Sequence, residues 1–338
     1  MQTYLVTGGA GFIGSNFIHY LLTRYHRDIV VVNVDKLTYA GNIHNLDGVK
    51  EYGNYVFIQA DINDLITLEK VFARYRPDVV VNFAAETHVD RSISSPRIFV
   101  ETNVLGTQAL LDMCLKYPVK KFVQVSTDEV YGSLGKEGVF TEDSPLRPSS
   151  PYASSKAAAD LILQAYHQTY GLPFNITRCT NNYGPLQMPE KLIPLVISRV
   201  LDGMPVPVYG EGTNIREWIF VEDHCRALEE VIHKGVTGEV YNIGSGCEIE
   251  NLRLVKLVID MVKELLPAGD RRKNCISHDL IELVADRKGH DFRYAVSSEK
   301  IRQATGWQPA VSFEEGIRFT VNWYLTHEEW VKKARQRL

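Results

Sequence analysis

The sequence predicts a doubly wound α/β fold of the Rossmann type, with helices on both faces of a parallel sheet and a smaller, interleaved C-terminal lobe. Short runs that are apolar throughout alternate with longer amphipathic stretches over roughly the first half of the chain. Strands buried on both faces have this composition, and their alternation with helices favours a parallel sheet between two helical layers. A glycine-rich turn also joins the first expected strand to the first expected helix.

Six strands and four helices are expected in the first half of the chain. The helix from Gly14 to Tyr25 illustrates the evidence, because apolar side chains such as Phe17, Ile18 and Leu21 recur at helical spacing. The strands are expected at YLVTGG, IVVVNVD, VFIQAD, DVVVNFAA, KFVQVST and FNITRCT. The other helices are expected over residues 65–75, 99–116 and 152–170.

The regular alternation ends after Arg178, where NNYGPLQMPEKLIP contains two prolines. Beyond it we expect a helix over 192–202, a turn-rich segment with one short strand in GMPVPVYGEGTNIREW, a strand at EVYNIG and a helix over 252–265. Long irregular segments of this kind usually carry function or are disordered. The predicted domains are a nucleotide-binding domain, residues 1–180 with about 217–246 returning to it, and a substrate lobe of residues 181–216 and 247–338.

The composition is that of an ordinary soluble protein. The chain has 338 residues, of which 45% are hydrophobic, and a formal net charge of −4, which gives no indication of nucleic-acid or membrane-surface binding. No apolar run approaches the ~18 residues of a membrane span, and strand-like residues from Tyr4 onward leave no room for a signal peptide. The five cysteines show no C-x-x-C spacing, so reduced thiols and a cytoplasmic location are expected.

The turn TGGAGFIG predicts a dinucleotide site. Gly8, Gly11 and Gly14 let the backbone approach a pyrophosphate, and the following helix start offers free N–H groups to the phosphates. Asp35 ends the second strand, 21 residues beyond Gly14, where it would accept hydrogen bonds from ribose hydroxyls. Its charge disfavours a 2′-phosphate, so NAD is expected rather than NADP, although the neighbouring Lys36 weakens this argument.

The stretch FVQVSTDEVYG ends a buried strand with two adjacent acids, Asp128 and Glu129. Neighbouring strand residues point to opposite faces, so both acids serve one site only if the backbone turns there. An isolated pair of this kind is more often a solvated strand end. Tyr152 and Lys156 favour a catalytic site over a solvated strand end, because their side chains share one face at the start of a helix. An ammonium group near a phenol is expected to lower the phenol pKa from ~10 toward neutrality.

These motifs together resemble the extended short-chain dehydrogenase/reductase superfamily, and within it the dTDP-glucose 4,6-dehydratase family. The resemblance covers nearly the whole chain and includes TGGAGFIG, AAETHVDRS, STDEVYG, PYASSKAAAD, NNYGP, PEKLIP and DRKGHDFRY. The glycine fingerprint and Y-x-x-x-K are shared across the superfamily, whereas TDE distinguishes this family from the epimerases. Lys288 departs from the pattern, since the family has proline there, and this bears on local nucleotide contacts.

The resemblance implies a hydro-lyase that converts dTDP-glucose to dTDP-4-keto-6-deoxyglucose. Tyr152 would take the C4 hydroxyl proton while NAD oxidises C4, which acidifies the C5–H bond. Glu129 would then remove the C5 proton, a protonated Asp128 would donate to the departing C6 oxygen, and the hydride would return to C6. Thr127 would orient the C4 oxygen. Without the resemblance, physical argument allows the two acids to exchange roles, although two adjacent carboxyl groups do shift each other's pKa.

The resemblance also implies the residues that bind NAD and the nucleotide sugar. His88 has no partner histidine at ligand spacing, so it is expected to be hydrogen bonded and no metal site is expected. The implied NAD-binding residues are Gly8, Gly11, Phe12, Ile13, Gly14, Asp35, Lys36, Thr38, Asp61, Ile62, Ala84, Ala85, Thr87, Asn103, Tyr152 and Lys156. The implied substrate-binding residues are Glu86, His88, Thr127, Asn182, Glu190, Lys191, Leu192, Pro207, Tyr209, Arg216, Asn251, Asp286 and His290.

Family members pair two helices per subunit into a four-helix interface, so a homodimer is expected. The corresponding helices, 99–116 and 152–170, carry apolar residues beyond one buried stripe, namely Leu110, Met113, Leu161, Ile162 and Ala165. The alternative is that both helix faces are covered within the chain. Alternative functions are another nucleotide-sugar dehydratase, an epimerase or a decarboxylase on the same scaffold, or a catalytically silent NAD-binding protein. The sequence leaves the nucleobase open among thymidine, uridine, cytidine and guanosine.

Overall fold

A parallel sheet of seven strands, in the order β10-β6-β5-β4-β1-β2-β3, forms the centre of the molecule. The computed structural model describes residues 1–337, and every neighbouring pair of strands in this sheet is parallel. The strands are β1 (Gln2–Thr7), β2 (Ile29–Asp35), β3 (Tyr55–Gln59), β4 (Val79–Asn82), β5 (Lys121–Thr127), β6 (Phe174–Cys179) and β10 (Val240–Ile243).

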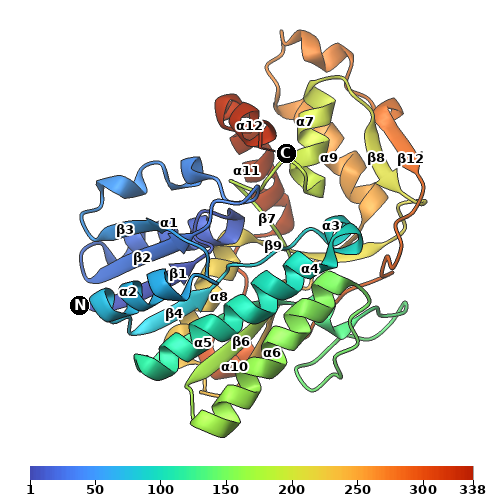
Figure 1. Cartoon of the computed structure of the whole chain (residues 1–338). Coiled ribbons are helices and arrows are strands. Elements are labelled where there is room, and N and C mark those ends of the chain that lie inside the picture. The colour runs from blue at the N-terminus through green and yellow to red at the C-terminus, as the bar shows by residue number, and fades with distance from the viewer. Residues whose placement is uncertain (338) are drawn as a thin grey trace.

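Helices cover both faces of this sheet (Figure 1). On one face α1 and α8 pack against each other and bury apolar strand residues such as Val6 and Val81. On the other face α2, α5 and α6 cover the alternate strand residues, including Leu5 and Val80. This arrangement confirms the expected Rossmann-type fold. The helices are α1 (Phe12–Tyr25), α2 (Leu65–Tyr75), α5 (Gly106–Lys116), α6 (Pro151–Tyr170) and α8 (Val221–Lys234).

The strand order reverses at β1, which lies between β2 and β4. Open parallel sheets bind ligands at the carboxyl ends of the strands near such a reversal. Three of the predicted functional segments lie at these ends: the glycine turn after β1, Asp35 at the end of β2, and Thr127 at the end of β5. The topology therefore brings together segments that are more than 100 residues apart in the sequence.

A second core lies in a smaller lobe, where residues such as Trp218, Val258 and Tyr324 are buried together. It contains a three-stranded sheet in the order β11-β9-β7 and a parallel pair, β12 and β8. Its strands are β7 (Asn181–Tyr183), β8 (Val206–Tyr209), β9 (Ile215–Phe220), β11 (Glu248–Glu250) and β12 (Ile281–Val284). Its helices are α7 (Leu192–Leu201), α9 (Asn251–Leu265), α11 (Phe313–Thr326) and α12 (Glu328–Arg335).

The chain passes repeatedly between the two parts of the molecule. β9 belongs to the lobe, but α8 follows it at once and packs on α1. β10 then rejoins the large sheet, α9 packs on α7 in the lobe, and α10 (Glu299–Thr305) packs on α8 and β10. The interleaving is visible in Figure 1 as yellow and orange segments in both parts. The domain boundaries given above stay a prediction.

Several elements differ from the sequence-based expectation, for local reasons. The expected helix over 99–116 is divided into α4 (Pro96–Phe99), a π-helical turn (Val100–Leu105) and α5. Helix α8 is not predicted because it begins directly after Phe220, with no glycine, proline or polar turn to separate it from β9. Helix α11 is also missed, although its start could have been predicted from the sequence, since Ser312 and Glu315 form a capping box there. Short elements such as α3 (Val89–Ser94) are not predicted either.

None of the helices within residues 1–337 is both long enough and apolar enough to cross a membrane.

Candidate active site

The glycine turn between β1 and α1 forms a cradle that only glycine backbone leaves open. Gly8 has a φ of +70°, and a Cβ atom added there would lie 2.6 Å from the backbone nitrogen of Ala84. A Cβ atom on Gly14 would overlap the carbonyl oxygen of Gly8 and lie 2.9 Å from the Cα atom of Gly9. No side chain caps the start of α1 at Gly11, so the free backbone N–H groups of the first turn of α1 remain available to an anion.

Asp35 ties the end of β2 to the glycine turn. Its carboxylate accepts hydrogen bonds from the backbone N–H groups of Ala10 (2.9 Å) and Leu37 (2.7 Å). The neighbouring Lys36 points its ammonium at Asp61, with an N–O distance of 2.6 Å. The Lys36 charge is thus paired with a carboxylate at the end of the neighbouring strand β3. This pairing weakens the argument that Lys36 would attract a 2′-phosphate.

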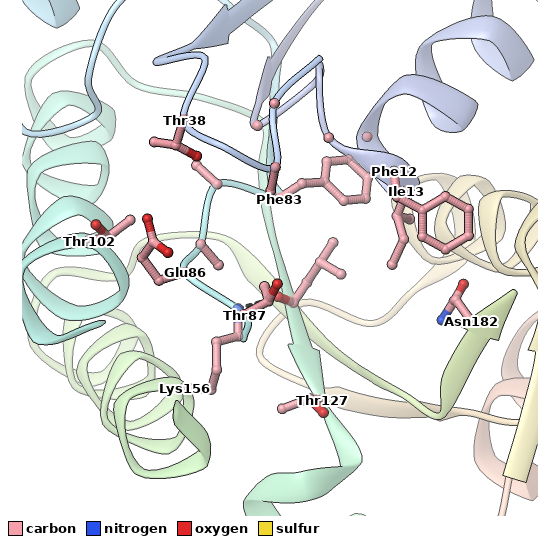
Figure 2. A pocket seen from close by; sticks show the side chains of 18 of the residues that line it. Phe12, Ile13, Thr38, Phe83, Glu86, Thr87, Thr102, Thr127, Lys156 and Asn182 are labelled. Atoms are coloured by element: carbon pink, nitrogen blue, oxygen red, sulfur yellow. Dashed lines mark hydrogen bonds between the residues drawn. The ribbon is translucent and has the colours of Figure 1, made fainter. Parts of the chain in front are cut away.

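A single cavity joins the glycine turn to the predicted catalytic residues (Figure 2). Its walls come from the ends of β1 to β6 and from the start of α6. Asn103 is the one predicted cofactor residue that does not line the cavity. Its buried amide instead bonds the backbone N–H and carbonyl of Glu86 and the Ser155 hydroxyl, which fixes the cavity wall. The lining cofactor candidates are Gly8, Gly11, Phe12, Ile13, Gly14, Asp35, Lys36, Thr38, Asp61, Ile62, Ala84, Ala85, Thr87, Tyr152 and Lys156.

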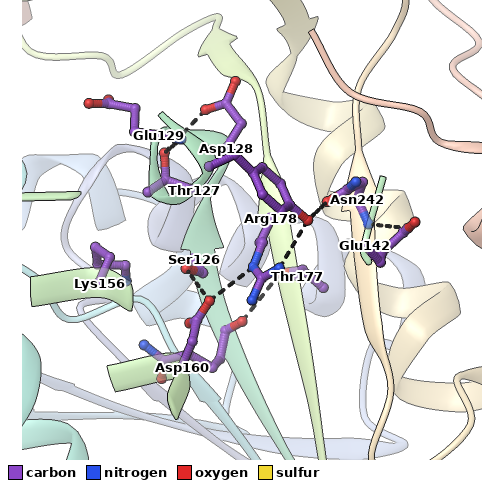
Figure 3. Close-up of polar contacts among 12 residues, drawn as sticks. Ser126, Thr127, Asp128, Glu129, Glu142, Lys156, Asp160, Thr177, Arg178 and Asn242 are labelled. Atoms are coloured by element: carbon purple, nitrogen blue, oxygen red, sulfur yellow. Dashed lines mark hydrogen bonds and ion pairs between the residues drawn. The ribbon is translucent and has the colours of Figure 1, made fainter. Parts of the chain in front are cut away.

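The backbone turns where the two adjacent acids occur. Residues Asp128–Tyr131 form a 3₁₀ turn, η4, directly after β5. The Thr127 hydroxyl caps this turn: it accepts from the Glu129 N–H at 3.2 Å and donates to the Asp128 carboxylate at 3.2 Å (Figure 3). Asp128 and Glu129 therefore line the same cavity as Tyr152 and Lys156. A continuing strand would have pointed the two acids to opposite faces.

The surroundings make the two acids chemically unequal. Burial raises the pKa of Asp128 well above its ordinary range, and the nearby Glu129 and Glu217 raise it further. Burial also raises the pKa of Glu129, but Arg287, Arg216 and Lys191 oppose that shift. Both pKa values are thus raised, but neighbouring carboxylates add to the rise at Asp128, whereas three cations oppose the rise at Glu129. These surroundings favour a proton on Asp128 rather than on Glu129, which fits the acid and base roles that the resemblance implies and that physical argument from the sequence leaves open.

The protein by itself does not show the lowered Tyr152 pKa that is expected from the sequence. Burial raises the pKa of the Tyr152 phenol well above its ordinary value, and the Glu129 carboxylate raises it further. The Lys156 ammonium donates a 2.6 Å hydrogen bond to the Val125 carbonyl, and burial lowers its own pKa. Desolvation and the neighbouring negative charge therefore set the direction of the Tyr152 pKa.

The predicted substrate residues fall into two groups. Glu86, Thr127, Asn182, Glu190 and Lys191 line the cavity. The remaining eight do not, and they lie on the lobe or at its border: His88, Leu192, Pro207, Tyr209, Arg216, Asn251, Asp286 and His290. Among them, His88 accepts a hydrogen bond from the Arg91 N–H and lies 3.6 Å from Glu190.

Arg216 is held rigidly in the lobe. Its guanidinium donates to the carbonyls of Ile215, Asp291 and Phe292 and lies 4.4 Å from the centre of the Tyr294 ring. Nearby, the His290 ring contacts both the Asp286 carboxylate (2.6 Å) and the Tyr209 ring. A preorganised guanidinium suits a diphosphate, and aromatic rings suit a nucleobase.

Three residues that act on the acids or on Arg216, namely Arg287, Glu217 and Tyr294, are not among the individual residues that the sequence predicts for the site. Arg287 lies in the segment DRKGH, which carries the family resemblance, so that segment contains the available signal. Glu217 and Tyr294 give no signal, because their relation to Asp128 and Arg216 depends on how β9 is placed in the fold. Over the described residues 1–337, no three His, Cys, Asp or Glu side chains are grouped to hold a metal ion.

Comparison with known proteins decides the family. The sequence model of the GDP-mannose 4,6-dehydratase family matches residues 5–320. A dTDP-glucose 4,6-dehydratase from Neisseria meningitidis serogroup B is 51% identical over 343 aligned residues, covering 98% of this chain and 95% of that protein. This chain belongs to the dTDP-glucose 4,6-dehydratase family.

Solved structures agree with this assignment. DesIV from Streptomyces venezuelae, a dTDP-glucose 4,6-dehydratase crystallised with NAD bound, is 46% identical with a TM-score of 0.92 and covers 98% of this chain and 100% of its own. A UDP-glucose 4-epimerase from Thermotoga maritima is 31% identical with a TM-score of 0.86 and covers 96% of this chain and 99% of its own. The fold is thus shared by dehydratases and epimerases, and the side chains of the site must distinguish them.

We predict that Gly14→Ala abolishes cofactor retention. Alanine normally stabilises a helix relative to glycine by ~0.5–1 kcal/mol, but here the added methyl overlaps the turn that the pyrophosphate must approach. We expect a loss of roughly 1–3 kcal/mol in the free energy of unfolding and purified protein without NAD. Urea unfolding and the nucleotide content of the purified protein measure these effects. Gly53→Ala is the matched control, because nothing lies near its added methyl; equal NAD content in both variants contradicts the prediction.

We predict that Asp128→Asn stabilises the protein at neutral and higher pH. The native state holds the Asp128 proton at pH values where the unfolded chain has lost it, because the native pKa is raised. The free energy of unfolding therefore falls as pH rises above the unfolded pKa of ~3.9, and asparagine removes this loss. Thermal unfolding across pH is the measurement: the gain should grow from acid to neutral pH. The exposed Asp28→Asn serves as control, and a pH-independent effect of Asp128→Asn contradicts the prediction.

Proposed function

We propose that the chain is an NAD-dependent dTDP-glucose 4,6-dehydratase, a hydro-lyase that forms dTDP-4-keto-6-deoxyglucose. The observation that carries the proposal is the cavity itself, in which Asp128 and Glu129 lie with Tyr152 and Lys156 beside the glycine cradle. Epimerisation at C4 needs no acid–base pair for C5 and C6, so these carboxyl groups favour dehydration. Close relatives carry this activity in their names, and the related structures contain NAD.

The cavity fits NAD on its own evidence. The turn after β1 excludes side chains and presents the open start of α1, and Asp35 provides a carboxylate at the end of β2. Gly8, Gly11 and Gly14 would hold the diphosphate, while Asp35 would hold the ribose. Bound there, NAD supplies a reversible two-electron oxidation of the sugar at C4 that is returned at C6, so it is recovered in each turnover.

Tyr152 would take the proton of the C4 hydroxyl. The positive charge of oxidised NAD would offset the burial and the Glu129 charge that raise the phenol pKa. Lys156 is anchored one helical turn away by the Val125 carbonyl and would keep a second positive charge nearby. Thr127 would hold the C4 oxygen from the end of β5.

Asp128 and Glu129 would divide the elimination between them. Once C4 is a carbonyl, the C5–H bond is acidic, and Glu129 would remove that proton as a base. Asp128, which keeps its proton through burial and the charges of Glu129 and Glu217, would give it to the C6 oxygen as water departs. The cations Arg287, Arg216 and Lys191 support the ionised state of Glu129.

The lobe would bind the nucleoside diphosphate. Arg216 and Arg287 would bind the diphosphate, since both already act electrostatically on Glu129 and so lie near the sugar site. Tyr209 and His290 would contact the base with their rings, which lie 6.1 Å apart. Lys191, which lines the cavity, would contact the sugar phosphate from the other side.

The primary test incubates purified protein with dTDP-glucose in deuterated water, without added NAD, and analyses the product by mass spectrometry. Loss of one water with deuterium at C5 supports dehydration and shows that NAD copurifies. An unchanged sugar mass with inverted C4 supports an epimerase instead. If no product forms, the UDP-, CDP- and GDP-sugars are tested next, which separates a wrong nucleobase from a wrong reaction.

We predict that Glu129→Gln separates oxidation from elimination. The variant should still reduce its bound NAD when dTDP-glucose is added, because Tyr152 and Lys156 remain, but water loss should fall ~10²–10⁴-fold. Absorbance of reduced nicotinamide and product mass measure the two steps. Glu137→Gln, in an exposed loop, should behave like the wild type. Full dehydration by Glu129→Gln contradicts the role of this residue.

We further propose that two copies form a homodimer through the face made by α4 to α6. Leu110 and Met113, expected at this interface, are instead buried in the core of the subunit, because the π-helical turn and α5 pack on α6. The support comes from other residues of the same face: Ile98, Val100, Leu105 and Leu161 are each at least 41% exposed. Exposed apolar side chains on neighbouring helices are typical of an interaction surface, and Figure 1 shows α4, α5 and α6 lying side by side.

We predict that Leu161→Arg produces monomers. A charge placed in an apolar interface lacks a partner, so the dimer dissociation constant should rise at least about tenfold. Sedimentation velocity measures the change. Phe319→Arg on α11 changes an equally exposed apolar residue away from this face (56% against 55%) and should leave the association state unaltered. If both variants match the wild type, the dimer face lies elsewhere.

We also propose a cytoplasmic location. All five cysteines are free, and three of them are buried among apolar groups, which fits a reducing compartment.

A further inference from the structure

A buried chain of polar contacts joins helix α6 to the turn that carries the two acids (Figure 3). Asp160 lies one helical turn beyond Lys156 on α6, and its Oδ2 atom accepts hydrogen bonds from the Arg178 Nε–H (3.0 Å) and the Ser126 hydroxyl (3.1 Å). Arg178 extends from β6 and donates through Nη1 to the Tyr131 hydroxyl at 2.9 Å. Tyr131 is the last residue of η4, the turn that begins with Asp128.

The chain is anchored at its far end in the sheet. The Tyr131 hydroxyl donates to the Asn242 side-chain oxygen on β10 at 2.8 Å, and the Tyr131 ring stacks on Phe140 with centroids 5.0 Å apart. The Arg178 guanidinium also lies 4.9 Å from the centre of the Tyr131 ring. Tyr131 therefore cannot shift without breaking contacts to β6 and β10, and the turn that contains Asp128 and Glu129 is held with it.

The Arg178–Asp160 ion pair is fully removed from solvent, with 3% and 0% of the two side chains exposed. A buried pair gives little net stability over an apolar pair of the same shape, because desolvation of both charges offsets their attraction. What such a network supplies is a fixed relative position of the elements that it joins. Here it joins α6, which carries Tyr152 and Lys156, to η4, which carries Asp128 and Glu129.

None of the three residues touches the cavity. Asp160, Arg178 and Tyr131 are absent from its walls, whereas Ser126 and the residues that they support line it. The second carboxylate oxygen of Asp160, Oδ1, is buried without a hydrogen-bond partner. The Asp160 charge also acts on Lys156: burial lowers the pKa of this ammonium, and Asp160 on the same helix and Cys179 on β6 oppose the shift.

We propose that Tyr131, Arg178 and Asp160 are positioning residues that align the two halves of the catalytic machinery. The proposal rests on the dehydratase function proposed above. The Tyr131 end holds the acid and base of the elimination, and the Asp160 end holds the charge and position of Lys156 for the oxidation. The two ends of the network should therefore affect different steps of one reaction, which a merely structural role would not do.

The first test is Tyr131→Phe, which removes one hydroxyl and keeps the ring that stacks on Phe140. We expect the elimination step to slow roughly 10- to 100-fold while C4 oxidation changes less than about twofold, since small misplacements of reacting groups have effects of this size. The bound NAD should then accumulate in its reduced form during a single turnover with dTDP-glucose. Absorbance of reduced nicotinamide and deuterium incorporation at C5 follow the two steps.

Tyr241→Phe is the matched control for this variant. Tyr241 lies on β10 beside Asn242, is as deeply buried as Tyr131 (1% against 2% exposed), and its hydroxyl accepts a hydrogen bond from the Val236 N–H, outside the network. Its loss should leave the ratio of the two rates unchanged. The proposal is overturned if Tyr131→Phe matches the wild type, or if both of its rates fall together as they would in a generally loosened protein.

The second test is Asp160→Asn, which keeps the shape of the side chain and removes its charge. C4 oxidation should slow more than elimination, and the pH at which its rate falls on the basic side should move downward, because Lys156 loses the charge that keeps it protonated. Equal slowing of both steps with an unmoved pH profile contradicts the role of Asp160. If this variant does not fold, Tyr131→Phe still decides the proposal.

A measurement without substrate completes the set. In a double-mutant cycle, the midpoints of urea unfolding for Tyr131→Phe, Arg178→Gln and their combination should be non-additive, because the two side chains share a hydrogen bond. Additive shifts contradict a connected network.

Failure of the proposed function would look different from failure of the positioning role, because the wild type itself would not dehydrate dTDP-glucose. If the positioning role is wrong, the wild type dehydrates dTDP-glucose, but Tyr131→Phe and Asp160→Asn do not slow oxidation and elimination to different extents.

Discussion

The meeting of parallel strands along one edge is the constraint on which the rest of the structure depends. The strands β1, β2, β4, β5 and β6 all run in the same direction. The segments that follow these strands therefore all lie along the same edge of the sheet. The glycine turn, Asp35 and the acids after Thr127 are distant in sequence and adjacent in space for this reason alone. Helix α6 then closes the site by placing Tyr152 and Lys156 across the same edge.

Burial gives the cavity its chemistry. Water would hold both adjacent carboxyl groups ionised at neutral pH and would hold the phenol protonated, so neither group would have a special role. In the enclosed site desolvation raises the pKa of both carboxyl groups; Glu129 and Glu217 add to the rise at Asp128, whereas Arg287, Arg216 and Lys191 oppose it at Glu129. The same desolvation raises the pKa of the Tyr152 phenol, and the Glu129 charge acts in the same direction.

The parts of the structure that depend on local pattern are predictable from the sequence, and those that depend on packing are not. The large sheet and its flanking helices follow from apolar runs and helical spacing, and the cofactor cradle follows from glycine spacing. The turn at Asp128 is inferred because two adjacent acids can serve one site only if the backbone turns there, and not from any turn-forming residue pattern. Helix α8 lacks a boundary residue, and the influence of Glu217 depends on β9, which lies about 90 residues away in sequence. The direction of the Tyr152 pKa is missed because burial cannot be seen in a sequence.

The repeated crossing of the chain between sheet and lobe has an evolutionary consequence. No single cut in the chain separates the large sheet from the lobe, since β9 leads directly into α8 and α10 returns to the sheet after β12. Recombination of gene segments therefore cannot exchange the lobe as one continuous piece without also interrupting the large sheet.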